Sequence, residues 1–302
     1  MRYLDLTWPT PAENLACDEA LLEVAEAGDG GETLRFWEPR DYFVVLGYAN
    51  RAAQEVDLEA CRAHGVPVFR RCSGGGAVLQ GPGCLNYNLV LKIADAAPLA
   101  NVTSTNRFIM QRHAEALAKL LPPPTEGHSQ KPFATWPPEA PPPPPFRHPL
   151  PLPGGEGRGE GAIRDSGAIE LHGKGEASSL APKQPAIRVQ GHTDLTLGER
   201  KFSGNSQRRQ QRCLVFHGTI LLEFDFTMIE QFLRPPSRQP CYRQSRSHRD
   251  FLVNLRLPAE PVKSALQAVW DARQPLAGIP HSVVDRLVRE KYSRTEWNFK
   301  YP

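Results

Sequence analysis

The chain has 302 residues, of which 40% are hydrophobic and 23% are charged, as is usual for a soluble globular protein. Its formal net charge of +3 is small and gives no reason to expect a nucleic-acid partner. No segment approaches 18 uncharged apolar residues, and no basic start precedes an apolar run, so neither a membrane span nor a signal peptide is expected. The six cysteines form no C-x-x-C pair or zinc-like spacing, which predicts reduced thiols in a cytoplasm and no stably bound metal.

The first third of the chain mixes predicted helices and strands without regular alternation. Asn14 is expected to cap a helix whose apolar residues recur at helical spacing as far as Val24. Strands are predicted on either side of a turn at Pro39-Arg40-Asp41. We expect, in chain order, strands over 34–37 and 43–46, a helix over 56–64, strands over 66–70 and 85–91, and a helix capped by Ser104.

Residues 122–186 break this pattern. They carry more than half of the chain's 30 prolines, including the run at 141–145, and the sequence LPLPGGEGRGEG. Such a composition cannot bury enough apolar surface to offset its ordering entropy, so we predict a disordered insertion. A Pro-rich motif that binds a partner is the alternative. Without the insertion about 240 residues remain, an ordinary size for one catalytic domain.

The rest of the chain resumes the mixed pattern. Short strands are predicted over 194–197, 201–203, 213–216 and 219–223. Helices are predicted over 228–233, 262–273 and 283–292. Since the strands do not alternate regularly with helices, the sequence predicts an α+β layer fold.

Residues 70–88 read RRCSGGGAVLQGPGCLNYN and form the most informative stretch. Consecutive glycines cost backbone entropy, and they are kept where the backbone takes a positive φ or lies against a ligand. Two arginines beside them supply planar donors for a carboxylate or a phosphate. The spacing is neither that of a P-loop nor that of a dinucleotide-binding loop. A flexible surface loop with solvated arginines is the alternative interpretation.

A second group of polar residues lies in DLTLGERKFSGNSQRRQQRCLVFHGT, residues 194–219. A turn at Gly198-Glu199 is expected to present Lys201, whose ammonium group can reach a phosphate or an acyl carbonyl. Gly204, Asn205 and the sequence His217-Gly218-Thr219 follow. Taken alone, Lys201 would be a surface lysine and His217 a structural histidine.

Read together, these segments resemble the lipoate–protein ligase A family of the biotin/lipoate ligase superfamily. The matching stretches occur in the family's order: NLACDEALLE (14–23), RRCSGGGAVLQGPGCLNYNLVL (70–91), GERKFSGNSQRR (198–209), FHGTILL (216–222), SRSHRDFLVNL (245–255) and KYSRTEWNF (291–299). The resemblance implies mixed, largely antiparallel sheets packed with helices, in a biotin/lipoate ligase catalytic domain of the class II synthetase-like kind. It also implies one such domain over 1–302, interrupted at 122–186, without the C-terminal accessory domain of longer bacterial ligases.

The reaction that the resemblance implies is a two-step acyl transfer. Lipoate or octanoate would react with ATP and Mg²⁺ to give acyl-AMP. The acyl group would then pass to a lysine on a lipoyl domain of a 2-oxoacid dehydrogenase E2 subunit or on the glycine cleavage H protein. Lys201 would be catalytic, and apolar residues such as Val45, Leu46 and Val78 would line the acyl tunnel. The residues expected to bind the substrate and the adenylate are Arg71, Ser73, Gly74, Gly75, Gly76, Ala77, Asn86, Gly204, Asn205, His217 and Gly218.

A departure from the family pattern keeps a second activity open. Many ligases of the family carry His-Asp after the glycine loop, whereas this chain has Gln80-Gly81-Pro82-Gly83, which resembles octanoyltransferases. Those enzymes take octanoyl from acyl carrier protein through a cysteine thioester. Cys241, after Pro240, is the candidate nucleophile if the protein is such a transferase, because residues 186–200 contain no cysteine.

The other cysteines are weaker candidates. Cys72 and Cys84 lie in the loop region, and Cys213 is expected in the core. A biotin ligase and a non-catalytic lipoyl-binding protein are further alternatives.

Overall fold

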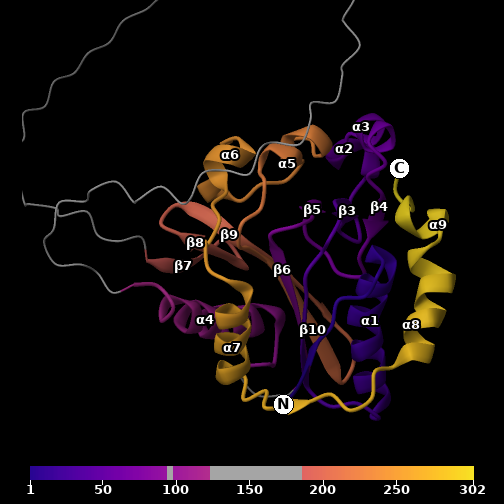
Figure 1. Cartoon of the computed structure of the whole chain (residues 1–302), viewed down its shortest axis with the longest axis vertical. Helices are drawn as coiled ribbons and strands as arrows, with labels where there is room; N and C mark the ends of the chain where they lie inside the picture. Colours follow the sequence, from indigo (N-terminus) through magenta and orange to yellow (C-terminus); the bar gives the residue numbers. More distant parts are fainter. Residues whose placement is uncertain (94–97, 123–185) are drawn as a thin grey trace, which may run out of the picture. The chain divides into compact units, whose positions relative to one another are not determined.

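The computed structural model describes residues 1–93, 98–122 and 186–302 (Figure 1). Residues 1–122 and 184–302 form one compact unit. The proposed insertion lies almost entirely outside the described residues, so its character and the single-domain assignment stay predictions. Within the described part, no helix is both long enough and apolar enough to cross a membrane.

Two sheets form the framework of the described chain. The larger has the strand order β11-β1-β2-β6-β10-β9-β8-β7, and the smaller has the order β4-β3-β5. Parallel pairing is confined to β1 with β2 and β11, and to β3 with β4, while all other neighbours are antiparallel. The strands are β1 (Arg2–Asp5), β2 (Thr33–Trp37), β3 (Phe43–Leu46), β4 (Val68–Arg70), β5 (Val78–Gln80), β6 (Cys84–Lys92), β7 (Ile187–Gln190), β8 (Asp194–Leu197), β9 (Arg200–Arg209), β10 (Cys213–Leu221) and β11 (Gln274–Pro275).

Helices cover both faces of the larger sheet (Figure 1). Its central strands alternate side chains, so Leu89 and Phe216 join a core with α4 and α7, whereas Val90 and Val215 join a core with α1 and α8. This arrangement confirms the α+β prediction. The α-helices are α1 (Pro11–Ala27), α2 (Ala52–Glu55), α3 (Leu58–Ala63), α4 (Val102–Ala118), α5 (Thr227–Phe232), α6 (His248–Phe251), α7 (Ala259–Val269), α8 (His281–Leu287) and α9 (Thr295–Asn298).

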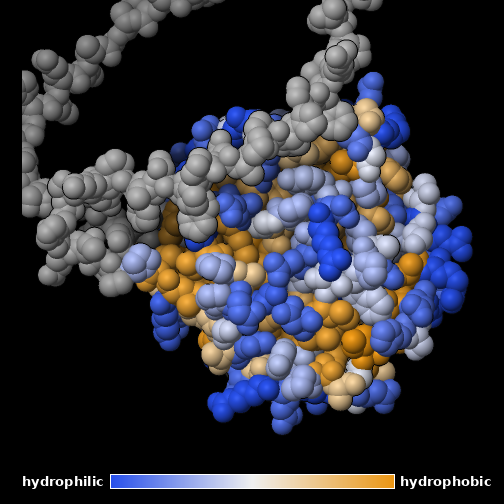
Figure 2. Space-filling view, in the orientation of Figure 1, coloured by the Kyte–Doolittle hydropathy of each residue, from blue (hydrophilic) through white to orange (hydrophobic). Residues whose placement is uncertain are grey.

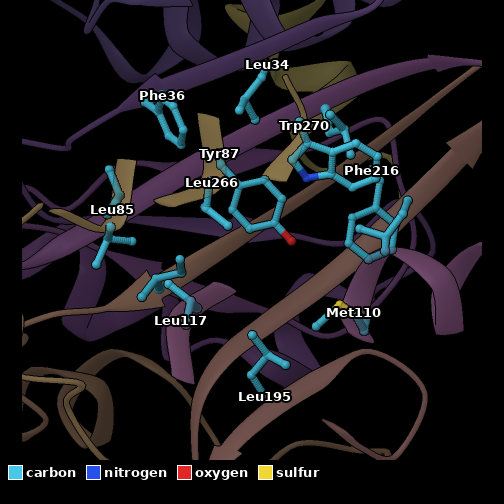
Figure 3. Packing of buried hydrophobic residues seen from close by; sticks show 14 of the residues in the cluster. Leu34, Phe36, Leu85, Tyr87, Met110, Leu117, Leu195, Phe216, Leu266 and Trp270 are labelled. Atoms are coloured by element: carbon cyan, nitrogen blue, oxygen red, sulfur yellow. The ribbon is translucent and has the colours of Figure 1, made fainter. Parts of the chain in front are cut away.

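The core beneath α4 and α7 includes one polar connection. Trp270 donates its indole N–H to Nε2 of the buried His113 at 2.7 Å, and the His113 ring meets Tyr87 edge-on at 4.9 Å. Figure 3 shows the Tyr87 ring among Leu266, Trp270 and other apolar side chains. The ring is therefore fixed by packing, and its hydroxyl donates to Asn205 Oδ1 at 2.6 Å.

Two helix starts differ from those expected. Thr10 caps α1, since its side chain accepts from the backbone N–H of Glu13, and the Glu13 carboxylate accepts from the backbone N–H of Thr10. Pro11 lies in the first turn. Asn14 is buried inside the helix instead. Asn101 rather than Ser104 caps α4, because its side-chain oxygen accepts from the Ser104 backbone N–H.

The strands after the insertion are longer than expected. β9 runs on through Gly204 and β10 through Gly218, whereas the predicted strands stop at 203 and are interrupted between 216 and 219. Both glycines make room for a side chain: a Cβ on Gly204 would lie 2.6 Å from Lys201 Nζ, and one on Gly218 would lie 1.6 Å from Asn205 Oδ1. Strands β2 and β3, expected around one turn, belong to different sheets.

The outer helices present polar surfaces. Helix α8 and the π-helix Val288–Tyr292 pack on α1, and their outward side chains include Arg286, Arg289 and Glu290. Figure 2 shows this edge of the molecule, on the right of the view, as mainly hydrophilic.

Candidate active site

A cleft of about 950 Å³ is lined by residues of both sheets, by α1 and by the loops around residues 191–193 and 236–243. Most of the predicted site residues meet there. Ser73 and Gly74 do not line the cleft, but they contact residues that do. The predicted residues that line it are Arg71, Gly75, Gly76, Ala77, Asn86, Lys201, Gly204, Asn205, His217, Gly218 and Cys241.

The glycine loop is built around the buried Arg71. Its guanidinium donates to the Gly74 carbonyl oxygen from Nε at 3.0 Å and from Nη2 at 2.5 Å, and to the Gly76 carbonyl at 2.9 Å. Gly75 has a φ of +90°, and a Cβ there would lie 2.7 Å from Arg71 Nη2, so only glycine fits. Burial lowers the pKa of Arg71 to about 10, which leaves it a cation at neutral pH. Arg71 therefore shapes the loop from beneath and brings a positive charge to the cleft wall.

Arg70 has a different function from its neighbour. Its side chain is fully buried and donates to the carbonyl oxygens of Gly47, Tyr48 and Asn50 at 2.8–3.0 Å. It also donates to the carbonyls of Trp297 and Asn298, at 3.1 and 3.2 Å. The interpretation of the two arginines as a pair of anion donors is thus wrong for Arg70, which attaches β4 to the C-terminal helix α9.

Lys201 lies at the start of β9, after the turn whose Gly198 has a φ of +62°. Its Nζ is 2.8 Å from Asp194 Oδ1, and a quarter of its side chain is exposed. Tyr242 donates its hydroxyl to the other oxygen of Asp194 at 2.7 Å. The lysine is thereby held across Gly204 and lines the cleft, and Asp194 is its one ion-pair partner among the described residues.

Asn205 was expected to orient a nucleotide, but its amide is engaged within the protein. Its Oδ1 accepts from the Tyr87 hydroxyl at 2.6 Å, and its Nδ2 donates to the Thr193 carbonyl at 2.6 Å. Thr193 returns a bond to the Asn205 carbonyl, also at 2.6 Å. Asn205 therefore attaches the loop before Asp194 to the sheet.

Asn86 is likewise part of a closed ring of hydrogen bonds. Gln80 donates to the Thr219 hydroxyl at 2.6 Å, Thr219 donates to Asn86 Oδ1 at 2.6 Å, and Asn86 donates back to Gln80 Oε1 at 3.0 Å. The ring connects β5 of the small sheet to β6 and β10 of the large one. Gln80, which departs from the His-Asp of many ligases, thus joins the two sheets at the cleft.

His217 lies beneath the glycine loop. Ser73 Oγ accepts from Arg71 Nε at 3.2 Å and lies 2.5 Å from His217 Nε2. Because Nδ1 of the ring is 3.9 Å from Asp18 Oδ2, we assign the ring proton to Nδ1, which leaves Nε2 to accept from Ser73. Burial lowers the pKa of His217 to about 3, and the Arg71 cation adds to the shift, so the ring is neutral. The neutral ring accepts a hydrogen bond from Ser73.

Asp18 was missed in the sequence. It forms a buried ion pair with Arg35 at 2.5 Å, and Arg35 also donates to Asn14 Oδ1 at 2.7 Å. Burial raises the pKa of Asp18, and the Arg35 cation opposes that shift. Asp18 lines the cleft with the apolar side chains of Leu15 and Trp37. The stretch NLACDEALLE carried the signal, since a charged residue among buried helical positions needs a partner.

Cys241 is the exposed member of the six cysteines, all of which lie in the described residues. It begins a one-turn 3-10 helix, Cys241–Arg243, and lines the cleft. Burial raises the pKa of Cys72 to about 11 and that of Cys84 to about 12, which suppresses their thiolates. Cys213 is buried in the core, as expected.

Gly204→Ala tests whether the position of Lys201 matters. The added methyl group would meet the flexible end of Lys201, so the melting temperature should stay within a few degrees. The ammonium group would be displaced, however, and transfer activity should fall by about 10- to 100-fold. Activity and a thermal melt measured on the same preparation check this. Unchanged activity would show that Lys201 need not lie across residue 204.

A glycine loop packed around Arg71, a lysine with a quarter of its side chain exposed and apolar side chains in the same cleft are typical of an enzyme that transfers or activates an acyl group. The family comparison agrees: residues 10–122 and 171–268 match the lipoyl protein ligase A/B catalytic domain. The chain belongs to this family, and it is an enzyme of the ligase or acyltransferase type.

Similar proteins carry both kinds of name. An octanoyltransferase LipM of Geobacillus kaustophilus is 25% identical over 99% of this chain and 98% of its own length. A lipoate-protein ligase A solved with ATP has a TM-score of 0.67 and 23% identity, covering 100% of this chain and 99% of that one. A bi-partite lipoate protein ligase of Thermoplasma acidophilum, studied with its E2 lipoyl domain, has a TM-score of 0.65 and 21% identity, covering 100% and 96%. The structural likenesses confirm the fold.

Proposed function

We propose that the protein is a lipoate–protein ligase, which converts lipoate or octanoate and ATP to acyl-AMP and passes the acyl group to a lipoyl-domain lysine. The observation that carries this proposal is the meeting of Lys201 and the glycine loop in one cleft of about 950 Å³. A medium-chain acid alone needs less space, whereas pockets of this size hold ligands as large as a drug or a nucleotide.

Each step has matching groups in the cleft. The substrate carboxylate attacks the α-phosphorus of ATP, and pyrophosphate leaves. Backbone N–H groups of the glycine loop bind the phosphate–carboxylate junction, while the Lys201 ammonium compensates the charge that accumulates on the acyl and phosphate oxygens. A neutral lysine amine of the acceptor then attacks the acyl carbon and AMP leaves, with the amine proton going to solvent.

The acyl chain has a defined place in this scheme. Leu15, Trp37, Val45 and Val78 line the cleft and supply an apolar surface. Leu46, also expected there, instead packs in the core around Val44 and Leu79.

Magnesium enters this scheme as part of MgATP. No group of three or more His, Cys, Asp or Glu side chains in the described part of the chain is arranged to hold a metal. Asp194, the carboxylate nearest Lys201, is already bonded to Lys201 and Tyr242. Phosphate oxygens are the usual ligands of Mg²⁺ in such reactions.

An octanoyltransferase is the second candidate, and Cys241 is the observation that favours it. The cysteine is exposed and lines the same cleft as Lys201, while the other five are buried. The relative named octanoyltransferase points the same way. If the acyl group passes through a thioester, Cys241 must carry it.

One assay separates the two. Purified protein and a lipoyl domain are incubated with lipoate, ATP and Mg²⁺, or with octanoyl acyl carrier protein and no ATP, and acceptor mass is measured. The ligase proposal expects modification in the first mixture, undiminished by Cys241→Ser. Modification in the second mixture alone, abolished by Cys241→Ser, would reject the ligase. Binding of lipoate without turnover in either mixture would indicate a non-catalytic lipoyl-binding protein.

The proposal includes a cytoplasmic location. All six thiols are free, and reduced cysteines are typical of that compartment.

A further inference from the structure

Residues 234–249, RPPSRQPCYRQSRSHR, form a strongly basic stretch of the chain. They contain five arginines and no acidic residue. Without those five arginines the net charge of +3 would become −2, so this short segment reverses the charge of the protein. Residues 236 and 238–243 of the segment line the cleft, which places the charge beside the proposed acyl-transfer site.

Two of the five arginines hold the segment in shape. Arg243 donates to the Arg246 carbonyl at 3.1 Å, and Arg246 donates to the Arg243 carbonyl at 3.0 Å. Both guanidinium groups lie over the Phe251 ring, at 4.8 and 5.3 Å from its centroid. Tyr242 fastens the same turn to Asp194. These contacts hold residues 242–246 in place beside Asp194, the partner of Lys201.

The remaining arginines face solvent. Arg249 pairs with Glu230 at 3.1 Å. Arg234 and Arg238 are exposed and form no ion pair or side-chain hydrogen bond with any other described residue. Arg238 is also a residue of the cleft lining. Both guanidinium groups are therefore exposed and free of partners among the described residues, and that of Arg238 belongs to the cleft lining.

We propose that Arg234 and Arg238 form a docking rim for the acidic surface of the acceptor protein domain, beside its target lysine. This inference rests on the proposed acyl transfer, because it assigns the acceptor to that site. Guanidinium groups pair well with carboxylates, and opposite charges at an interface rim speed association. An enzyme that acts only on small neutral substrates needs no such surface. Here the acceptor lysine lies on a folded domain, which must be brought to the edge of the cleft.

The test compares two variants with the same charge change. Arg234→Glu/Arg238→Glu alters the rim, and Arg107→Glu/Arg273→Glu alters exposed arginines that do not line the cleft. Binding of an acidic, unmodified lipoyl domain is titrated by fluorescence anisotropy at low and high salt. The rim variant should raise Kd by about tenfold or more and flatten the salt dependence, while the control stays close to the original protein.

Other outcomes would overturn the inference. Equal losses in both variants would indicate a general charge effect. If the rim variant binds the domain normally but needs more ATP in acceptor-free pyrophosphate exchange, the arginines bind the nucleotide. If it loses only the binding of acyl carrier protein, they bind an acyl donor. Because the titration requires no turnover, it tests the rim even if the exchange assay rejects the ligase.

Discussion

Lys201→Ala should lower the rate of acyl transfer by about 10²- to 10³-fold, the usual effect of removing one preorganised group that stabilises transition-state charge. The lysine ammonium contacts Asp194 within the described structure, and a quarter of its side chain is exposed. Its loss should therefore change the fold little. Steady-state transfer kinetics and circular dichroism on the same sample measure both quantities.

The matched control is Lys119→Ala, which removes an exposed lysine at the end of α4. Lys201→Arg adds a second comparison, because a planar guanidinium carries the charge but does not fit the space above Gly204 in the same way. Full activity of Lys201→Ala would remove the central mechanistic claim, since no other lysine lines the described cleft.

Arg70→Ala should destabilise the protein by about 3 kcal/mol or more. The substitution would leave the buried or partly buried carbonyl oxygens of Tyr48, Asn50 and Asn298 without this donor. An unsatisfied buried group costs about 1–3 kcal/mol, and the cavity adds to the loss. Urea unfolding, followed by far-ultraviolet circular dichroism, measures the change.

Arg51→Ala is the control, because Arg51 is exposed and follows Asn50, whose carbonyl oxygen accepts from Arg70. Arg70→Lys should recover only part of the stability, since an ammonium group has three donors and cannot span acceptors on two sides. A loss below 1 kcal/mol in Arg70→Ala would show that water replaces the guanidinium, and that α9 does not depend on it.

The sequence was sufficient to place the main parts of the site. The glycine loop, Lys201 and the strand that carries His217 were each visible as local patterns, and local patterns fix local backbone. Their meeting in one cleft followed from the family resemblance. The fold class could likewise be predicted, because mixed helix and strand periodicities allow few layer arrangements.

What the sequence did not show are the partners that each side chain acquires from distant strands. Asn86 and Asn205 were expected to bind the adenylate and both line the cleft, while their amides also bond to Thr219, Tyr87 and Thr193. No local pattern distinguishes an asparagine that binds a ligand from one that joins two strands. The same applies to Arg70, whose partners lie on α9.

Arg70 also has a consequence for how the enzyme is made. Its acceptor Trp297 lies 227 positions further along the chain, and Asn298 lies 228 positions further. During synthesis on the ribosome, the strand that leads into the glycine loop emerges long before these partners exist. The cleft wall beside that loop is therefore completed only after residues 297 and 298 have been synthesised, and water solvates the Arg70 guanidinium until then.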